Sequence, residues 1–432
     1  MKHSVSLIAA VLLAAPAAVA VVPNVDQNDV VLSQDSQSRL VTVTYELTGV
    51  PAVITVDFQT NGVANAATGW ASIGEVNFTN TTGAVNRVVP TGKQAIFWQP
   101  RATWPDREIP AGKFRAVVKA WATNAPPDYC VISLMTDEQV ETKQANDAAW
   151  VFTRRRYFVS ANAVPCGVSH PMYKTENLLL RKIPAAGVIW RMGNYGSDSA
   201  NLKPHKVMLT RDYYMGVYEF TAGQKAFLDG EVGTSAFALG KVTWLRIRGT
   251  YDSYPWPDAE GNPQRNVDGS SILGLLRTRT GIDSFDLPTE AQWEYACRAG
   301  MGGQTYNHPW TAVWANWKAA LKEVAWCADN YNDGNNIGRQ HEVGLKPAND
   351  WGLYDMLGNT CERTLDWYGD YVVSQDISID PIGPRNGENK VWRGGSGWDS
   401  ADKMYIAYRW SKSADQYDAS HGFRVVCDAV AK

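Results

Sequence analysis

Apolar and polar residues alternate with a period of two along the first part of the chain. The clearest runs are Leu40 to Tyr45 and Val53 to Phe58, and Gly, Pro and Asn separate such runs. Alternation sends successive side chains to opposite faces of a strand, so that one face can be buried. Further strands are predicted at Ala84–Val89, Gln94–Trp98 and Phe114–Trp121. The pattern predicts an immunoglobulin-like β-sandwich over residues 27–160, with the strands of 131–160 at its edge or in the connection. We interpret this module as a spacer or docking unit without chemistry of its own.

The pattern changes beyond Ile183 to short strands, few helices and long loops rich in Gly, Asn and Asp. The strongest helix prediction is Thr289–Arg298, because Pro288 precedes it and Thr289 to Gln292 has the form of a capping start. Helical spacing places Trp293, Ala296 and Cys297 on one face. No internal repeat of about 20–50 residues is visible, which argues against a solenoid or propeller.

The length of 432 residues exceeds the roughly 100–200 residues of one domain, so the chain is expected to contain two. Net charge is −3, and the longest run of basic residues is Arg154 to Arg156. This composition excludes a nucleic-acid-binding protein, which would carry a basic patch. The 18 Trp residues are expected either to fill a loop-rich core or to line a binding surface.

Residues 1–20 have the form of a secretory signal. Lys2 supplies the positive start, Val5 to Ala15 the apolar run, and Ala18 to Ala20 the small-residue cleavage site. The apolar run is shorter than the about 20 residues that span a bilayer, and no later segment is apolar enough to span one. We therefore predict a secreted, periplasmic or cell-surface protein without a membrane span. Its six cysteines lie in a disulfide-permissive compartment, but their spacing determines no pairing.

Several motifs in the C-terminal part resemble the sulfatase-modifying-factor, or formylglycine-generating enzyme, family. They occur in the family's order over residues 190–424: Trp190-Arg191-Met192-Gly193, Pro204-His205-Lys206-Val207, Tyr213-Tyr214-Met215-Gly216-Val217-Tyr218-Glu219, Leu287-Pro288-Thr289-Glu290-Ala291-Gln292-Trp293-Glu294-Tyr295-Ala296, Trp351-Gly352-Leu353-Tyr354-Asp355-Met356-Leu357-Gly358-Asn359, Arg393-Gly394-Gly395-Ser396 and Gly422-Phe423-Arg424. The resemblance implies an α+β, loop-rich, C-type-lectin-like domain over residues 183–430, stabilised by calcium. The predicted sandwich lies outside it.

The resemblance also implies a structural calcium loop within residues 355–362. Calcium takes six to eight oxygen ligands. Asp355 and Glu362 are predicted to supply carboxylates, and Met356, Gly358 and Thr360 to supply carbonyls. A second family site is predicted at Asn316 and the carbonyl of Trp317. The alternative interpretation of residues 355–362 is an acidic surface turn.

The enzymes of this family hold copper with two cysteine thiolates shortly after the Gly-Gly-Ser motif. Here no cysteine follows Ser396 until Cys427. The nearby Asp399 and Met404 do not replace two thiolates, because a carboxylate is a hard ligand and a thioether a weak one. Copper binding is therefore not expected.

Two functional hypotheses follow. The first is a non-catalytic binding or structural module for a peptide or glycan, whose ligand-binding face is formed by Ser396, Trp398, Asp399, Tyr405, Arg409 and Trp410. The alternative to such a binding face is that the aromatic residues belong to the hydrophobic core and that Arg409 and Arg424 are buried ion-pair partners of Asp or Glu. The second hypothesis is a formylglycine-generating oxidase acting on sulfatase cysteines, which would use cysteines elsewhere, such as Cys327 and Cys361. The oligomeric state is not determined by these patterns.

Overall fold

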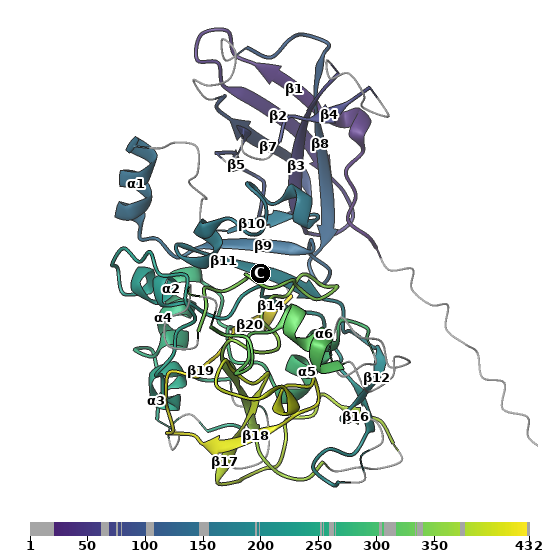
Figure 1. The fold of residues 1–432 in the computed structure, drawn as a ribbon. Coiled ribbons are helices and arrows are strands. Elements are labelled where there is room, and N and C mark those ends of the chain that lie inside the picture. The colour runs from purple at the N-terminus through teal and green to yellow at the C-terminus, as the bar shows by residue number, and fades with distance from the viewer. Residues whose placement is uncertain are drawn as a thin grey trace, which may run out of the picture.

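The computed structural model (Figure 1) describes residues 21–429, apart from 62–68, 75–76, 79, 101–107, 147–154, 195–196, 198, 251–252, 254, 259–262, 264, 302–304, 306–316, 333, 335–339 and 372–375. The predicted signal segment, residues 1–20, lies outside the described residues. The fold is mixed α+β, with a β-rich N-terminal region.

Two sheets face each other in the N-terminal region. One has the order β1-β2-β7-β5 and the other contains β4, β3 and β6, with β8 also paired to β3. Their bounds are β1 Val31–Gln34, β2 Val41–Leu47, β3 Ala52–Thr60, β4 Ala71–Ser72, β5 Thr82–Gly83, β6 Val88–Val89, β7 Gly92–Trp98 and β8 Phe114–Ala122. The inward side chains alternate as predicted and form one core, including Val43, Ile54, Phe58, Ile96 and Trp98. The predicted strand Ala84–Val89 is the exception, because only Val88 and Val89 pair with β3.

A five-stranded antiparallel sheet follows the sandwich and crosses the middle of the molecule (Figure 1). Its order is β10-β9-β11-β14-β20, with bounds β9 Tyr129–Ser133, β10 Arg155–Phe158, β11 Asn177–Ile183, β14 Tyr213–Gly216 and β20 Val426–Asp428. This corrects the predicted sandwich boundary at residue 160. The strand β9 pairs with β11 and not with a sandwich strand, so the two-sheet unit ends with β8. All five residues of β9 are buried, which a sandwich edge would not require.

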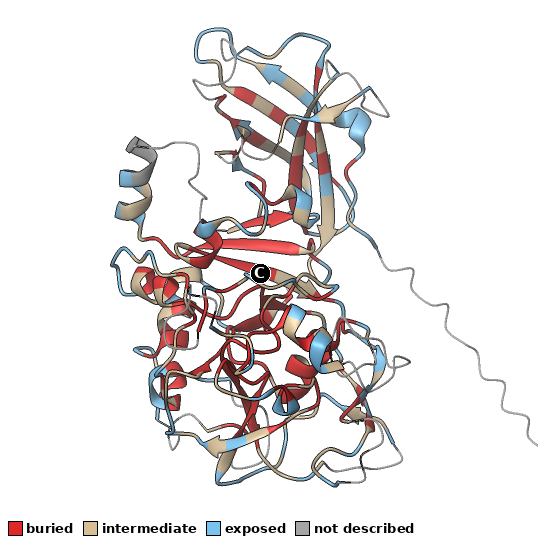
Figure 2. Cartoon of the chain, viewed as in Figure 1, coloured by how far each residue is buried: buried red, intermediate tan, exposed pale blue. Residues whose placement is uncertain are grey.

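The C-terminal region contains two smaller sheets, of order β12-β13-β16 and β18-β17-β15-β19. These strands are β12 Ile189–Met192, β13 His205–Met208, β15 Cys361–Trp367, β16 Ser378–Ile379, β17 Asn389–Arg393, β18 Trp410–Ser413 and β19 His421–Gly422. The helices are α1 Asp137–Asn146, α2 Ala222–Leu228, α3 Trp244–Arg248, α4 Ile272–Thr280, α5 Glu290–Arg298 and α6 Trp317–Val324. Buried residues concentrate in the long central strands and around α5 (Figure 2).

The predicted helix is confirmed as α5. Thr289 is its N-cap: the Gln292 N–H donates to Thr289 Oγ1, and the Thr289 N–H donates to Gln292 Oε1. This reciprocal capping satisfies two of the N–H groups that a helix start leaves open. Trp293, Ala296 and Cys297 are fully buried, as the helical spacing predicted.

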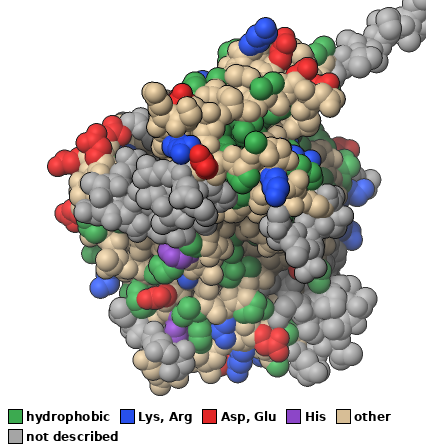
Figure 3. Space-filling model, turned by 90° about the horizontal axis from the view of Figure 1, so that it is seen from above, with side chains coloured by type: hydrophobic (Ala, Val, Ile, Leu, Met, Phe, Trp, Pro, Cys, Tyr) green, Lys and Arg blue, Asp and Glu red, His purple; other side chains and the backbone are tan. Residues whose placement is uncertain are grey.

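Figure 3 views the molecule from the sandwich end, and on that face the Lys and Arg side chains are scattered instead of forming one patch. No helix in the described part of the chain is both long and apolar enough to cross a membrane.

Candidate functional site

The Gly394-Gly395-Ser396 segment forms a tight, buried turn at the end of β17. Gly394 and Gly395 have φ values of 88° and 74°, in the left-handed region that favours glycine. A Cβ atom on Gly395 would lie 2.6 Å from Met404 Cγ, so a side chain there would clash with the core. The Ser396 hydroxyl donates to Asp399 Oδ2 at 2.6 Å, and the Ser396 N–H donates to the same oxygen at 3.0 Å. Asp399 therefore closes the turn, and Ser396 is 1% exposed.

A row of half-buried aromatic rings lies beside this turn. We call Trp317, Tyr405, Tyr408 and Trp410 the aromatic row. Its neighbouring rings meet edge to face, with centroid distances of 6.4, 5.3 and 5.4 Å in that order. The ammonium groups of Lys403 and Lys412 lie 5.2 and 5.7 Å from the Trp410 ring centroid. The row thus brings together two of the predicted ligand-binding residues, Tyr405 and Trp410. Tyr408 lies between them and was not among the predicted residues. Trp398 is also half-buried.

Arg409 has a structural position, contrary to its predicted place on the binding face. Its guanidinium donates to Glu290 Oε1 and Oε2 at 2.6 and 2.8 Å, and to the carbonyl oxygens of Asn201 and Gly369. Arg409 is 6% exposed. All three guanidinium nitrogens of Arg409 thus donate to groups inside the protein, which leaves few N–H donors for a ligand. The alternative interpretation, a buried ion pair, is the one that the structure bears out for Arg409 and for Arg424.

All six cysteines are free thiols, and all except Cys166 are buried. Cys361 lies beside the Gly-Gly-Ser turn, where burial and the charge of Asp399 raise the pKa of its thiol and the Gly395 N–H lowers it. Burial is the main cause that raises the pKa of Cys361 and of Cys327. Raised pKa values keep these groups as thiols, whereas copper(I) coordination and nucleophilic chemistry use the thiolate.

The predicted calcium loop surrounds a cluster of buried carboxylates. Asp355 and Asn359 have φ values of 53° and 58°, and the Gly344 N–H donates to Asp355 Oδ2 at 2.6 Å. Glu362 is bound by the Arg424 guanidinium and by the Trp293 indole, whose Nε1–H donates to Oε2 at 2.7 Å. The loop is therefore buried and not the acidic surface turn that the sequence left open.

Glu219 belongs to this cluster and was not among the site residues that the sequence predicted. Its carboxylate accepts from Asn359 Nδ2 at 2.6 Å and from the Thr360 N–H at 2.9 Å, and it is fully buried. The available signal was its position: one carboxylate directly after the otherwise apolar segment Tyr213 to Tyr218. Burial, followed by the charges of Asp355 and Glu362, raises the pKa of Glu219 well above its ordinary value.

The same physical cause acts on Asp355, whose pKa is raised to about 6 mainly by burial. A cation at the loop would offset this burial of negative charge, and Asp355 with nearby carbonyls offers the oxygen ligands that calcium prefers. Glu362 differs from its predicted role in that both of its oxygens already pair with Arg424. Among the described residues, no three His, Cys, Asp or Glu side chains are arranged as a metal site, so backbone carbonyls would be needed.

The second predicted calcium site is only partly within the described residues. Asn316 lies outside them. Trp317 begins α6, and its ring belongs to the aromatic row. The Trp317 side chain therefore packs against Tyr405 in the aromatic row.

The family that the motifs indicated is also the one whose sequence pattern matches this chain. The model of the sulfatase-modifying factor enzyme 1-like domain matches residues 183–429, which is more than half of the chain. The chain belongs to this family. The match begins at the last residue of β11 and ends just after β20, so the sandwich and the strands β9 and β10 precede the family domain.

Individual relatives cover the same region. The formylglycine-generating enzyme of Streptomyces coelicolor is 28% identical over 211 residues, which are 44% of this chain and 63% of that enzyme. The chain thus spans less than two thirds of that relative's length. The chaperone protein LppX of Paenibacillus barcinonensis is 27% identical over 261 residues, 54% of this chain and 86% of LppX. Among solved structures, Treponema denticola variable protein 1 is 25% identical with a TM-score of 0.43, over 58% of this chain and 95% of its own.

Proposed function

We propose that this protein is an exported, non-catalytic binding or structural module, whose family domain is stabilised by calcium and binds a peptide or glycan at the aromatic row. One observation carries the proposal. The turn after Gly394 and Gly395 is closed by the carboxylate of Asp399, and no thiol occurs in residues 394–426, where the copper cysteines of the family's oxidases would be needed. Soft copper(I) requires soft sulfur ligands, which this turn does not offer.

The aromatic row supports binding. Its four rings are half-buried, so each keeps an exposed part while its packing against the next ring limits its motion. Rigid aromatic surfaces bind the apolar faces of sugars and the side chains of peptides at low cost in conformational entropy. Lys403 and Lys412 beside Trp410 add positive charge that would favour an acidic ligand. The printed name of LppX, a chaperone protein, is a reason to include peptide ligands in the search.

Calcium would be held by Asp355 and by the carbonyls of Met356, Gly358 and Thr360. It would supply positive charge next to the buried carboxylates of Asp355 and Glu219. Asn359, which orients the Glu219 carboxylate, and Arg424, which pairs with Glu362, would then hold the rest of the cluster in place.

The catalytic part of the proposal is tested by incubating the protein with copper, a reductant and a cysteine-containing sulfatase peptide. Mass spectrometry is expected to return the unmodified peptide. A mass loss corresponding to conversion of the cysteine thiol to an aldehyde would reject the proposal in favour of the formylglycine-generating oxidase.

The binding part is tested with a glycan array and a peptide library on the full chain. Trp410→Ala and Tyr405→Ala are expected to weaken any ligand that is found by about tenfold or more, because each removes a stacking surface. Trp70→Ala is the matched control, since Trp70 is a half-buried indole of the N-terminal unit with the guanidinium of Arg115 over its ring. Equal loss in all three variants, or no ligand in either library, would count against a binding role for the row.

A further inference from the structure

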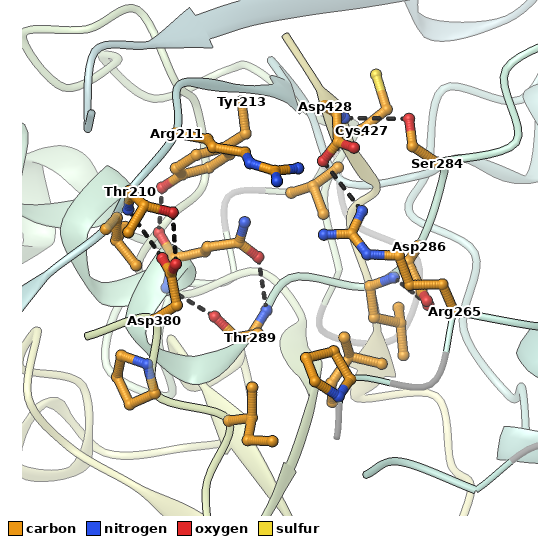
Figure 4. Close-up of a pocket in the computed structure, with 18 of the residues that line it drawn as sticks. Thr210, Arg211, Tyr213, Arg265, Ser284, Asp286, Thr289, Asp380, Cys427 and Asp428 are labelled. Atoms are coloured by element: carbon orange, nitrogen blue, oxygen red, sulfur yellow. Dashed lines mark hydrogen bonds and ion pairs between the residues drawn. The ribbon is translucent and has the colours of Figure 1, made fainter. Parts of the chain in front are cut away.

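A cavity of about 330 Å³ lies beside the N-terminus of α5. No residue of the aromatic row lines it. Its walls come from residues 209–213 before and within β14, from the start of α5, from residues 380–382 and from β20 (Figure 4). None of the described residues that line it comes from 391–417. Its volume falls within the range of about 300–1,000 Å³ that is typical of small-molecule sites.

The floor of the cavity is apolar. Trp256, Leu287, Leu365 and Val426 line it, and each is at most 5% exposed. Ile382 is half-buried at the wall. Ile382, with the small exposed parts of these buried side chains, forms an apolar wall from which an aromatic or branched aliphatic group would displace water.

The acidic groups around the cavity are bound by the protein itself. Asp286 Oδ1 and Oδ2 accept from the Arg248 guanidinium at 2.8 and 2.9 Å. Asp380 accepts from the Thr210 N–H at 2.9 Å, and Asp428 pairs with Arg265 at 3.0 Å. Figure 4 shows the contacts of Asp380 and Asp428 around the rim. The carboxylates are therefore held in place by donors of the chain and are not directed at a cation in the cavity.

Three donors at the cavity have no such partner. Arg211 makes no hydrogen bond or ion pair with any residue that the structure describes, although it stands on the rim near Tyr213 and Asp428 (Figure 4). The Trp256 indole N–H is buried and lacks an acceptor among the described residues. Gln292 uses its Oε1 to cap α5, which leaves its NH₂ group as the part available to the cavity. The unpaired Trp256 N–H is buried and therefore costly, so an acceptor from a ligand would stabilise it, whereas Arg211 is exposed and free to turn toward an anion at the rim.

We propose that this cavity binds an organic monoanion, namely a carboxylate attached to an apolar body, such as the C-terminal residue of a peptide or an acylated aromatic amino acid. The carboxylate pairs with the Arg211 guanidinium, and the apolar body packs on Trp256 and Leu365. The lining acids Asp286, Asp380 and Asp428 make a single negative charge a better match than the double charge of phosphate, because like charges at close range repel. This site is separate from the aromatic row and does not depend on the function proposed for it.

The proposal is tested by calorimetric titration of the full chain with N-acetyl-L-phenylalanine. We expect saturable binding, and at least about tenfold weaker binding of the neutral N-acetyl-L-phenylalaninamide, because the amide removes the charge that pairs with Arg211. Arg211→Gln is expected to weaken the carboxylate by about tenfold or more and to leave the weak binding of the amide unchanged. Inorganic phosphate is expected not to compete.

Two further variants keep the test decisive. Arg246→Gln removes an exposed arginine of α3 that does not line the cavity, and it is expected to bind as the unmodified chain does. Ile382→Trp fills the cavity from its wall and is expected to abolish binding while the melting temperature shows that the chain is folded. Absence of saturable binding, equal affinity for acid and amide, an unaffected Arg211→Gln variant, or competition by phosphate would each overturn the proposal.

Discussion

At the scale of single residues, the buried charges of the family domain divide into those that are balanced and those that are not. Arg409 with Glu290 and Arg424 with Glu362 are balanced pairs whose guanidinium groups bind both carboxylate oxygens. Glu219 and Asp355 are not balanced, and burial raises the pKa of both. We therefore expect large losses of stability when a member of a balanced pair is mutated. We expect the stability of the family domain to depend on cations and pH through Glu219 and Asp355.

Calcium is expected to raise the melting temperature, and a chelator to lower it. The folded state raises the pKa of Asp355 from 3.8 to about 6. A raised acid pKa means that this group favours folding while protonated, and that its contribution is lost as pH rises from 3.8 toward 6. A cation restores that loss, so the effect of calcium is expected to be larger at pH 7.5 than at pH 5.

Asp355→Ala tests the same site. It is expected to abolish the dependence of the melting temperature on calcium, whereas Asp350→Ala, which changes an exposed carboxylate five residues earlier, is expected to keep it. Melting curves recorded with calcium and with chelator at both pH values make the comparison. Identical curves for the unmodified chain under all conditions would exclude a calcium site at this loop.

Arg409→Leu is expected to destabilise the protein by about 3 kcal/mol, because it removes the two-point pairing of the buried Glu290 carboxylate and leaves it the Arg393 guanidinium at 3.5 Å and the Tyr371 hydroxyl at 3.2 Å. Denaturant unfolding measures this loss, and Arg246→Leu on the exposed face of α3 serves as the control, with an expected change within about 0.5 kcal/mol. A small effect of Arg409→Leu on stability would return Arg409 to the ligand-binding face that the sequence first indicated.

At the scale of elements, α5 holds several parts of the family domain in position. Its N-cap Thr289 lies at the proposed anion cavity, and its buried Glu294 pairs with Arg298 and with Arg393 of β17, directly before the Gly-Gly-Ser turn. Trp293 donates to Glu362 at the carboxylate cluster. A short helix therefore connects the cavity, the turn and the carboxylate cluster.

Thr289→Ala is expected to lower the free energy of unfolding by about 1 kcal/mol, because it removes the side-chain acceptor for the Gln292 N–H. Thr289→Ser keeps a hydroxyl acceptor and is expected to retain most of that stability. Denaturant unfolding of both variants provides the measurement. Equal stability of the Ala and Ser variants would mean that tertiary packing alone defines the start of α5.

At the scale of the whole molecule, the sandwich and the family domain are joined through the five-stranded sheet. β9 pairs with β11, which leads into the family domain, while Arg156 of β10 donates to the Phe78 carbonyl at 3.2 Å and to Thr81 Oγ1 at 3.3 Å in the sandwich. Arg156 is 2% exposed. The strands of this sheet thus pair with strands of the family domain, while side chains such as Arg156 also contact the sandwich.

Residues 21–123 are expected to fold alone, because their two sheets share one core that needs no strand from outside. Dispersed amide signals and a cooperative melting curve would be the measured result. A fragment of residues 21–160 is expected to gain little further stability, since Arg156 and Tyr157 bond to the sandwich but β9 lacks its partner β11 in that fragment. If only the longer fragment folds, β9 and β10 are part of the sandwich after all.

The sequence by itself determined the features that depend on local pattern. Alternation identified the sandwich strands β2, β3, β7 and β8, capping chemistry identified α5, and the ordered motifs identified the family. The strand and helix predictions succeed because a side-chain period of two and a reciprocal cap are properties of neighbouring positions. The order of the motifs can be read directly along the chain. The missing thiols after Ser396 are likewise visible in the sequence.

Only the tertiary structure decided which distant residues meet. Strand pairing placed β9 beside β11 and not in the sandwich, because its run Tyr129–Ser133, apolar except for Ser133, is buried on both faces there. Glu219 lies in the same cluster as Asp355 although 136 positions separate them in the sequence, and the Arg409 side chain turns inward to Glu290. Charge pairing across long separations depends on how the loops pack, which no local spacing encodes.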